Sequence, residues 1–220
     1  MFIGHFGVGF AAKASAPKVS LGLLFAAAQF VDLLWPTLLL LGVERVRVEP
    51  GATAVTPLVF ESYPVSHSLL AVAGWALLVG AVYLLVRRDR LGAAVLAALV
   101  VSHWLLDAVV HHPDLPLVPG GTARIGLDAW SSLPLTLALE LPLFALGVLL
   151  YARATSARDA VGRWGLWGLV AFLLVVHLGN LFGPPPPGAT AIAWMGQAQW
   201  LLVIAGYWVD RHRRPAGARA

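Results

Sequence analysis

The sequence predicts an all-α protein: a polytopic bundle of transmembrane helices with about six spans and a short re-entrant helix near its N-terminus. Of the 220 residues, 59% are hydrophobic and only 12% are charged, whereas soluble domains carry about 25% charged residues. The mean hydropathy is +0.80. Apolar stretches of about 20 residues, the length that a helix needs to cross a bilayer, recur along the chain between polar loops. These observations together predict an integral membrane protein.

The apolar segments define the expected elements in order. Residues 2–12 are apolar but too short to cross a bilayer, so we expect them to insert only part of the way. Proline frees the carbonyl four residues back, so Pro36 is expected to open the first span at Asp32. Residues 1–209 should form one integral-membrane domain, followed by a basic cytoplasmic tail, 210–220. The six predicted spans are Val19–Leu41, Val65–Val86, Leu91–His111, Leu133–Tyr151, Trp164–Phe182 and Ala191–Val209.

Lys and Arg are distributed unevenly among the loops. The N-terminal segment, the turn 87–90, the loop 152–163 and the tail hold 12 of the 15, and the alternating loops hold 3. Because Lys and Arg favour the cytoplasmic side, both termini are expected inside and the loops 43–64 and 112–132 outside. The basic residues do not cluster as nucleic-acid binding requires, so no nucleic-acid partner is expected. The absence of Cys excludes disulfides and thiolate metal sites.

Residues 100–114, VVSHWLLDAVVHHPD, are the most informative segment. His103, Asp107 and His111 recur every four residues, so on a helix they form one polar stripe, and His112 follows directly. Ionisable groups at membrane depth are costly and mark functional sites. This helix is therefore the first candidate for a site.

The other ionisable side chains of the spans are predicted at similar depths. Asp32, His67, Glu140 and His177 all fall in the outer half or the middle of their spans. The spans contain three carboxylates and no Lys or Arg. Buried carboxylates must be paired, protonated or bound to metal, so either a shared proton or a divalent cation is expected. His together with Asp is typical of zinc and related metals.

Structural interpretations stay open for several of these residues. His177 and Glu140 are equally well explained by hydrogen bonds to a neighbouring helix. The pair His111-His112 is also explained by an interfacial position. A purely structural role is disfavoured for one set with matched depths: Asp32, His67, His103 and Asp107.

The order of these residues resembles the bacterial membrane-bound metal-dependent hydrolases. That family shows an early Gly-His, an Asp after an apolar run, a Thr-His-Ser that opens a helix, and a His-x-x-x-Asp. The matching residues here are Gly4-His5, Asp32, Ser66-His67-Ser68 and His103 with Asp107. The same order is similar to the zinc-dependent phospholipase C and single-strand nuclease superfamily, in which the last Asp bridges two zinc ions. The resemblance covers about residues 1–150.

The chain departs from the family in two places. The family's Pro-Asp-x-Asp-His around the first Asp is Val31 to Trp35 here and keeps one carboxylate. The family's His-Arg-Gly ahead of Thr-His is Ser62-Tyr63-Pro64 here. The resemblance therefore does not extend to the family residues that would hold a third metal ion, or to an Arg that would bind phosphate.

The resemblance implies a hydrolase in a bacterial cell (inner) membrane with a divalent metal, zinc first among the candidates. It implies the following metal ligands: His5, Asp32, His67, His103 and Asp107. His111, His112 and Glu140 are candidate catalytic residues that would pass protons or complete a second site. Arg124, the only basic residue of its loop, is the candidate for binding an anionic head group. The expected substrate is a phosphoester or ester of a lipid or lipid-linked molecule at the outer leaflet.

Two other classes of function stay open. The same His and Asp residues could serve a transporter or a relay of protons or metal ions. The gathering of polar groups in one leaflet and the lack of a clear inverted repeat disfavour that class. The third class is a non-catalytic scaffold with a structural metal. A closed site of four protein ligands would favour the scaffold, and an open position would favour the hydrolase.

Overall fold

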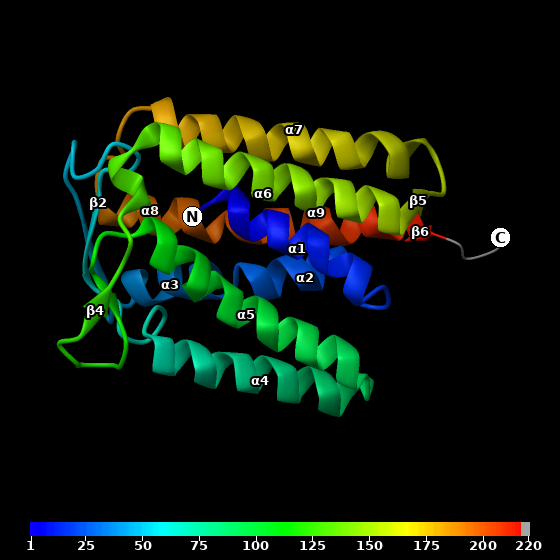
Figure 1. Cartoon of the computed structure of the whole chain (residues 1–220), viewed down its shortest axis with the longest axis horizontal. Helices are drawn as coiled ribbons and strands as arrows, with labels where there is room; N and C mark the ends of the chain where they lie inside the picture. The colour runs from blue at the N-terminus through cyan, green and yellow to red at the C-terminus, as the bar shows by residue number, and fades with distance from the viewer. Residues whose placement is uncertain (217–220) are drawn as a thin grey trace.

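The computed structural model describes residues 1–216 as a bundle of roughly parallel and antiparallel helices with short two-stranded sheets at its ends (Figure 1). The predicted all-α helical bundle is confirmed. The helices are α1 (Ile3–Ser15), α2 (Leu21–Ala28), α3 (Phe30–Leu40), α4 (Leu69–Arg87), α5 (Arg90–Val110), α6 (Leu133–Ala154), α7 (Ala160–Phe182), α8 (Ala189–Gln197) and α9 (Gln199–Arg211). The strands are β1 (Arg45–Val48), β2 (Leu58–Ser62), β3 (Leu115–Pro116), β4 (Arg124–Ile125), β5 (Thr155–Ala157) and β6 (Arg213–Pro215), and a 3₁₀ turn, η1, spans Ala129–Ser131.

The number of spans differs from the predicted six. Among the described residues, four helices are long and apolar enough to cross a membrane: α4, α5, α6 and α7. A fifth is obtained if α2 and α3 count as one span that is bent by 58°. The predicted span Ala191–Val209 is instead divided into α8 and α9 at Ala198. Ala198 is flanked by Gln197 and Gln199, and Gln197 Nε2 donates a 2.7 Å hydrogen bond to Thr37 Oγ1 of α3. Polar side chains therefore interrupt the apolar run at this point.

The bend in the first predicted span lies at Gln29 rather than at Pro36. Pro36 is inside α3, whereas Gln29 separates α2 from α3. Gln29 is fully buried, and both polar atoms of its side chain lack a hydrogen-bond partner in the described part of the chain. The polar group at this bend was not anticipated from the sequence.

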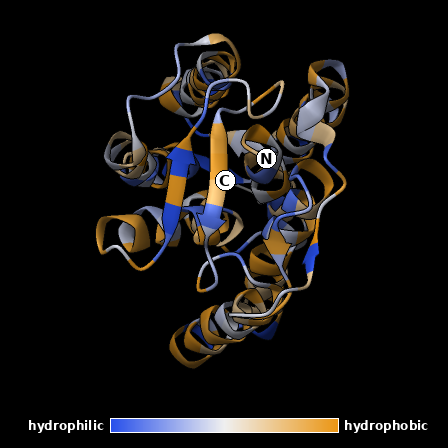
Figure 2. Ribbon diagram, turned by 90° about the vertical axis from the view of Figure 1, so that its left-hand side faces the viewer, coloured by the Kyte–Doolittle hydropathy of each residue, from blue (hydrophilic) through white to orange (hydrophobic). Residues whose placement is uncertain are grey.

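The long helices turn apolar side chains outward. Leu77 and Leu85 of α4 are 74% and 77% exposed, and Val175 of α7 is 65% exposed. Figure 2, which views the molecule from the end that carries β1 to β4, shows mainly hydrophobic helix ribbons and hydrophilic segments in the strands. An apolar exterior of this kind indicates a membrane protein.

Close backbone contacts place α1 inside the bundle. α1 packs along α6, and a Cβ atom on Gly147 would lie 2.0 Å from the carbonyl oxygen of Gly7. α2 packs against α9 in the same way, where a Cβ on Gly206 would lie 3.1 Å from the Cα of Gly22. Only glycine allows backbones to approach this closely. The N-terminus of α1 therefore lies in the interior (Figure 1).

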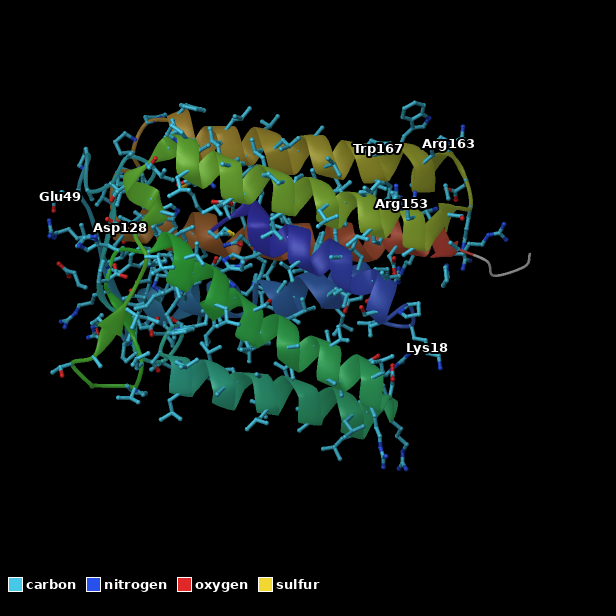
Figure 3. All side chains as sticks on the ribbon, in the orientation of Figure 1. Lys18, Glu49, Asp128, Arg153, Arg163 and Trp167 are labelled. Carbon is cyan, nitrogen blue, oxygen red and sulfur yellow. The ribbon has the colours of Figure 1, made fainter. Side chains whose placement is uncertain are left out.

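The two ends of the bundle differ in charge. Lys18, Arg153 and Arg163 lie at one end, and Glu49 and Asp128 lie at the other (Figure 3). At the basic end β5 pairs with β6. The predicted tail is thus part of the fold as far as Ala216, and its last residues, 217–220, lie outside the described residues.

Candidate metal centre

Two helices and the segment before a third bring ligand atoms together near the end that carries β1 to β4. Asp32 comes from α3, His67 lies two residues before the start of α4, and His103 comes from the second half of α5. Asp32 Oδ1 lies 3.6 Å from Nε2 of both histidines. One atom from each of these residues lies within 4.8 Å of the other two. Both histidines are buried, and the Asp32 side chain is 22% exposed.

The orientation of His103 leaves its Nε2 free for a metal. Its Nδ1 lies 2.8 Å from the carbonyl oxygen of Ala28 at the end of α2. A carbonyl oxygen can only accept, so Nδ1 carries the proton. Nε2 has no hydrogen-bond partner among the described residues, although Asp107 Oδ2 is 3.1 Å away. A buried imidazole nitrogen that faces two carboxylates without a hydrogen bond fits a metal ligand.

Main-chain hydrogen bonds fix the position of His67 beside His103. The His67 carbonyl accepts a 2.8 Å hydrogen bond from Trp104 Nε1 of α5, and the His67 amide donates to the Tyr63 carbonyl at 3.1 Å. Nδ1 of His67 is 2.6 Å from Ser66 Oγ. This contact leaves Nε2 to face Asp32 and Asp107.

Asp107 joins this group to a second one. Its Oδ2 faces His103 at 3.1 Å and His67 at 3.9 Å. Its Oδ1 lies 3.0 Å from His5 Nε2 and 2.7 Å from the Met1 amine. The rings of His5 and His103 stack with centroids 3.7 Å apart. The amine of Met1 is a cation that the prediction from the sequence did not consider.

The spacing of the first group fits a metal ion. In a tetrahedral zinc site with ligand bonds of about 2.1 Å, neighbouring ligand atoms are about 3.4 Å apart. The 3.6 Å separations around Asp32 are close to this value and too long for hydrogen bonds. His5, His103 and Asp107 form the second group, and neither group contains both carboxylates. The five predicted ligands therefore meet as two overlapping groups that can hold a metal ion, not as a single four-ligand set.

His111 lies beside this centre. It is buried, its ring centroid is 6.5 Å from that of His67, and its Nδ1 is 3.0 Å from Asp114 Oδ1. Tyr63 donates a 2.6 Å hydrogen bond to the same carboxylate oxygen. Burial lowers the pKa of His111, against the opposing effect of Asp114, and burial and Asp114 raise the pKa of Tyr63.

The structure does not bring the other three predicted residues into the ligand groups. The His112 side chain is 69% exposed and lies 3.2 Å from Asp128 Oδ1. Arg124 is exposed on β4. Glu140 Oε2 accepts hydrogen bonds from the amides of Phe2, at 3.0 Å, and Gly4, at 3.3 Å. Glu140 thereby satisfies donors at the start of α1, as a carboxylate at a helix N-terminus does.

Two buried polar residues near the centre were missed. Glu44 is 1% exposed but stands in the sequence among exposed charged residues, which gave no sign of its burial. Gln29 lies only three residues before Asp32, and its position in a long apolar run was the only signal. His177, which the sequence did single out, is buried with both ring nitrogens unpartnered among the described residues.

A scan of protein-family models, a search of curated proteins and a search of solved structures found no match to this chain. The types and number of its ligands indicate what chemistry the centre can support. Imidazole and carboxylate ligands suit zinc and related divalent metals. A group with three protein ligands leaves a coordination position for water or substrate, as in catalytic zinc sites.

Proposed function

We propose that the protein is a membrane-embedded, metal-dependent hydrolase, with zinc as the metal. Its substrate would be a phosphoester or ester of a lipid or lipid-linked molecule at the outer leaflet of a bacterial inner membrane. One observation carries the proposal: the Nε2 atoms of His103 and His67 are both buried and face the same carboxylate oxygen of Asp32 at 3.6 Å, and that of His103 makes no hydrogen bond within the described residues. Each histidine keeps its other nitrogen occupied elsewhere.

The residues of the centre divide into proposed metal ligands and residues that would assist the reaction. Asp32, His67 and His103 would hold the ion, and Asp107 would link it to His5, or to a second ion there. A divalent metal in such a site lowers the pKa of water and polarises an ester bond. His111 is held by Asp114 through Nδ1, and its lowered pKa keeps it neutral, so it can accept a proton.

The surroundings favour a lipid substrate. The centre lies among helices with an apolar exterior, and the segment that carries β3 and β4 covers its end of the bundle (Figure 1). Arg124 in that segment is exposed, so its guanidinium is free to bind a phosphate or carboxylate.

The test is metal analysis combined with hydrolysis by the detergent-purified protein. We expect stoichiometric zinc in the wild type and release of phosphorylated or acyl products from lipid vesicles. His103→Gln and Asp32→Asn should each lose the metal and the activity. His212→Gln is the matched control, because His212 lies at the basic end of the bundle, where it pairs with Asp159. Wild-type protein that folds but binds no divalent metal would refute the proposal.

A second candidate is a relay of protons or metal ions. The predicted gathering of polar groups in one leaflet disfavours a relay, but Lys13, Asp210 and Tyr151 form a largely buried network toward the other, basic end. Lys13 Nζ is 2.7 Å from Asp210 Oδ2, and Tyr151 donates to Oδ1 at 2.8 Å. Metal or proton flux into protein-containing liposomes, lost in Asp210→Asn while hydrolysis persists, would favour this candidate.

A further inference from the structure

Glu44 is a buried carboxylate that hydrogen bonds hold in place. It lies between α3 and β1 and is 1% exposed. Its Oε1 accepts from the amides of Val65 and Ser66, both at 2.8 Å. Its Oε2 accepts from Ser66 Oγ at 2.6 Å. Both oxygens are thus engaged, and the second contact leads toward the metal centre.

The direction of the hydrogen bonds can be followed from Glu44 to His67. An ionised carboxylate can only accept, so the single proton of the Ser66 hydroxyl points at Glu44. Ser66 Oγ, 2.6 Å from His67 Nδ1, must then accept at that contact. The proton of a neutral His67 therefore resides on Nδ1, and the lone pair of Nε2 faces Asp32 and Asp107.

We infer that Glu44 is a positioning residue that acts through Ser66 to fix the tautomer of His67 and present its Nε2 as a metal ligand. This inference rests on the proposed function, because it deepens the role of the same centre. Partners of this kind orient metal-bound histidines, and their loss commonly costs about 10- to 100-fold in metal affinity.

A purely structural role for Glu44 makes a different prediction. The two amide bonds to Oε1 alone would attach the segment after α3 to the start of α4. In that case the contact of Oε2 with Ser66 would add stability without affecting the state of His67. The variants must therefore separate the stability of the fold from the tautomer of one ring.

The Glu44→Gln variant separates the stability of the fold from the tautomer of His67. The two amides that donate to Oε1 require an acceptor there, so the carboxamide oxygen takes that place and its NH₂ group faces Ser66. Ser66 Oγ would then accept from Gln and donate to His67 Nδ1. The chain of hydrogen bonds reverses, which forces the proton onto Nε2 and blocks the ligand position. Ser66→Ala cuts the chain, so adding it to Glu44→Gln should relieve the reversal.

The first measurement is ¹⁵N NMR of the His67 ring in metal-free protein, at about pH 9, where an ordinary imidazole is neutral. We expect the Nδ1–H form in the wild type and the Nε2–H form in Glu44→Gln. Ser68→Ala is the matched control. Ser68 also neighbours His67, but its Oγ donates to the Pro64 carbonyl and accepts from the Ala71 amide. Its loss should lower the melting temperature and leave the tautomer unchanged.

The second measurement is titration with Co²⁺, followed by its visible absorption. Affinity should fall about 10- to 100-fold in Glu44→Gln. It should fall less in Ser66→Ala and in the double variant, and stay unchanged in Ser68→Ala. A His67 tautomer that is the same in wild type and Glu44→Gln would overturn the inference, whether or not metal binds. A tautomer that switches in a protein without Co²⁺ affinity would uphold the control of the His67 tautomer by Glu44, and would refute both its role in presenting a metal ligand and the hydrolase.

Discussion

At the scale of single residues, the His103 side chain of α5 connects the backbone at the end of α2 to the candidate metal centre. Its Nδ1 is bonded to Ala28 O and its Nε2 faces two carboxylates. A lone membrane histidine is ordinarily explained by one hydrogen bond to a neighbouring helix. His103 has that bond and a second nitrogen that faces two carboxylates, and this second nitrogen is what a single hydrogen bond to a neighbouring helix leaves unexplained.

The lowered pKa of His111 predicts a pH dependence of stability. Because burial lowers this pKa, the unfolded chain takes up the proton first as the pH falls. The contribution of neutral His111 is complete above about pH 6.5, the ordinary pKa of histidine, and is lost progressively below it. His111→Asn should therefore flatten the acid side of a plot of melting temperature against pH. Parallel curves for the two proteins would show that His111 does not titrate there.

Arg124 is expected to contribute to substrate binding and not to metal binding. An exposed charge-assisted contact is worth on the order of 1 kcal/mol, so, if the proposed hydrolase acts on an anionic lipid, Arg124→Ala should raise KM about 5-fold at unchanged metal content. Arg47→Ala serves as control, since Arg47 is also exposed but already pairs with Glu49 and Glu61. A variant of Arg124 that loses zinc would show that the residue has a different role.

The candidate metal centre shows which residues can be predicted from the sequence and which cannot. His103 and Asp107 could be paired because a helix places residues four apart on one face, and matched depth added Asp32 and His67. Glu44 could not be found in this way, because it is brought to Ser66 by tertiary structure alone. The division of the ligands into two groups was equally hidden, since depth along a span says nothing about the direction of a side chain.

At the scale of elements, the contact between α1 and α6 positions His5. The Gly7 and Gly147 backbones touch, and the short helix therefore lies deep enough for His5 to stack on His103. The sequence predicted a short inserted segment, but nothing in its hydropathy selected α6 as the neighbour.

Gly147→Ala tests this contact. The added methyl would overlap a backbone oxygen, which cannot move aside as a flexible side chain can. Overpacking of this kind costs about 1–3 kcal/mol, so a clear drop in melting temperature and weaker metal binding are expected. Gly168→Ala in α7 is the control, because nothing lies within 4 Å of its added Cβ. There the better helix propensity of alanine should leave stability equal or higher.

At the scale of the whole molecule, the uneven charge predicts an orientation in the membrane. The basic end, with Lys18 and Arg153 (Figure 3), should face the cytoplasm. The chain has no Cys, so single cysteines can be introduced at Thr122 and at Arg88, both exposed. A membrane-impermeant maleimide added to intact cells should label Thr122→Cys and not Arg88→Cys. Labelling of both from outside would contradict the predicted orientation and the outward-facing centre.

The packing of α2 against α9 has a consequence for biosynthesis. The face of α2 around Gly22 is covered by α9 around Gly206, which the ribosome produces some 180 residues later. During translation this face of α2 therefore lacks its partner in the fold until α9 has been made. The bend at Gln29 and the candidate ligand Asp32 directly follow α2 in the chain. We therefore expect the candidate ligands, all of which precede α6, to take their final positions only after α9 has packed against α2.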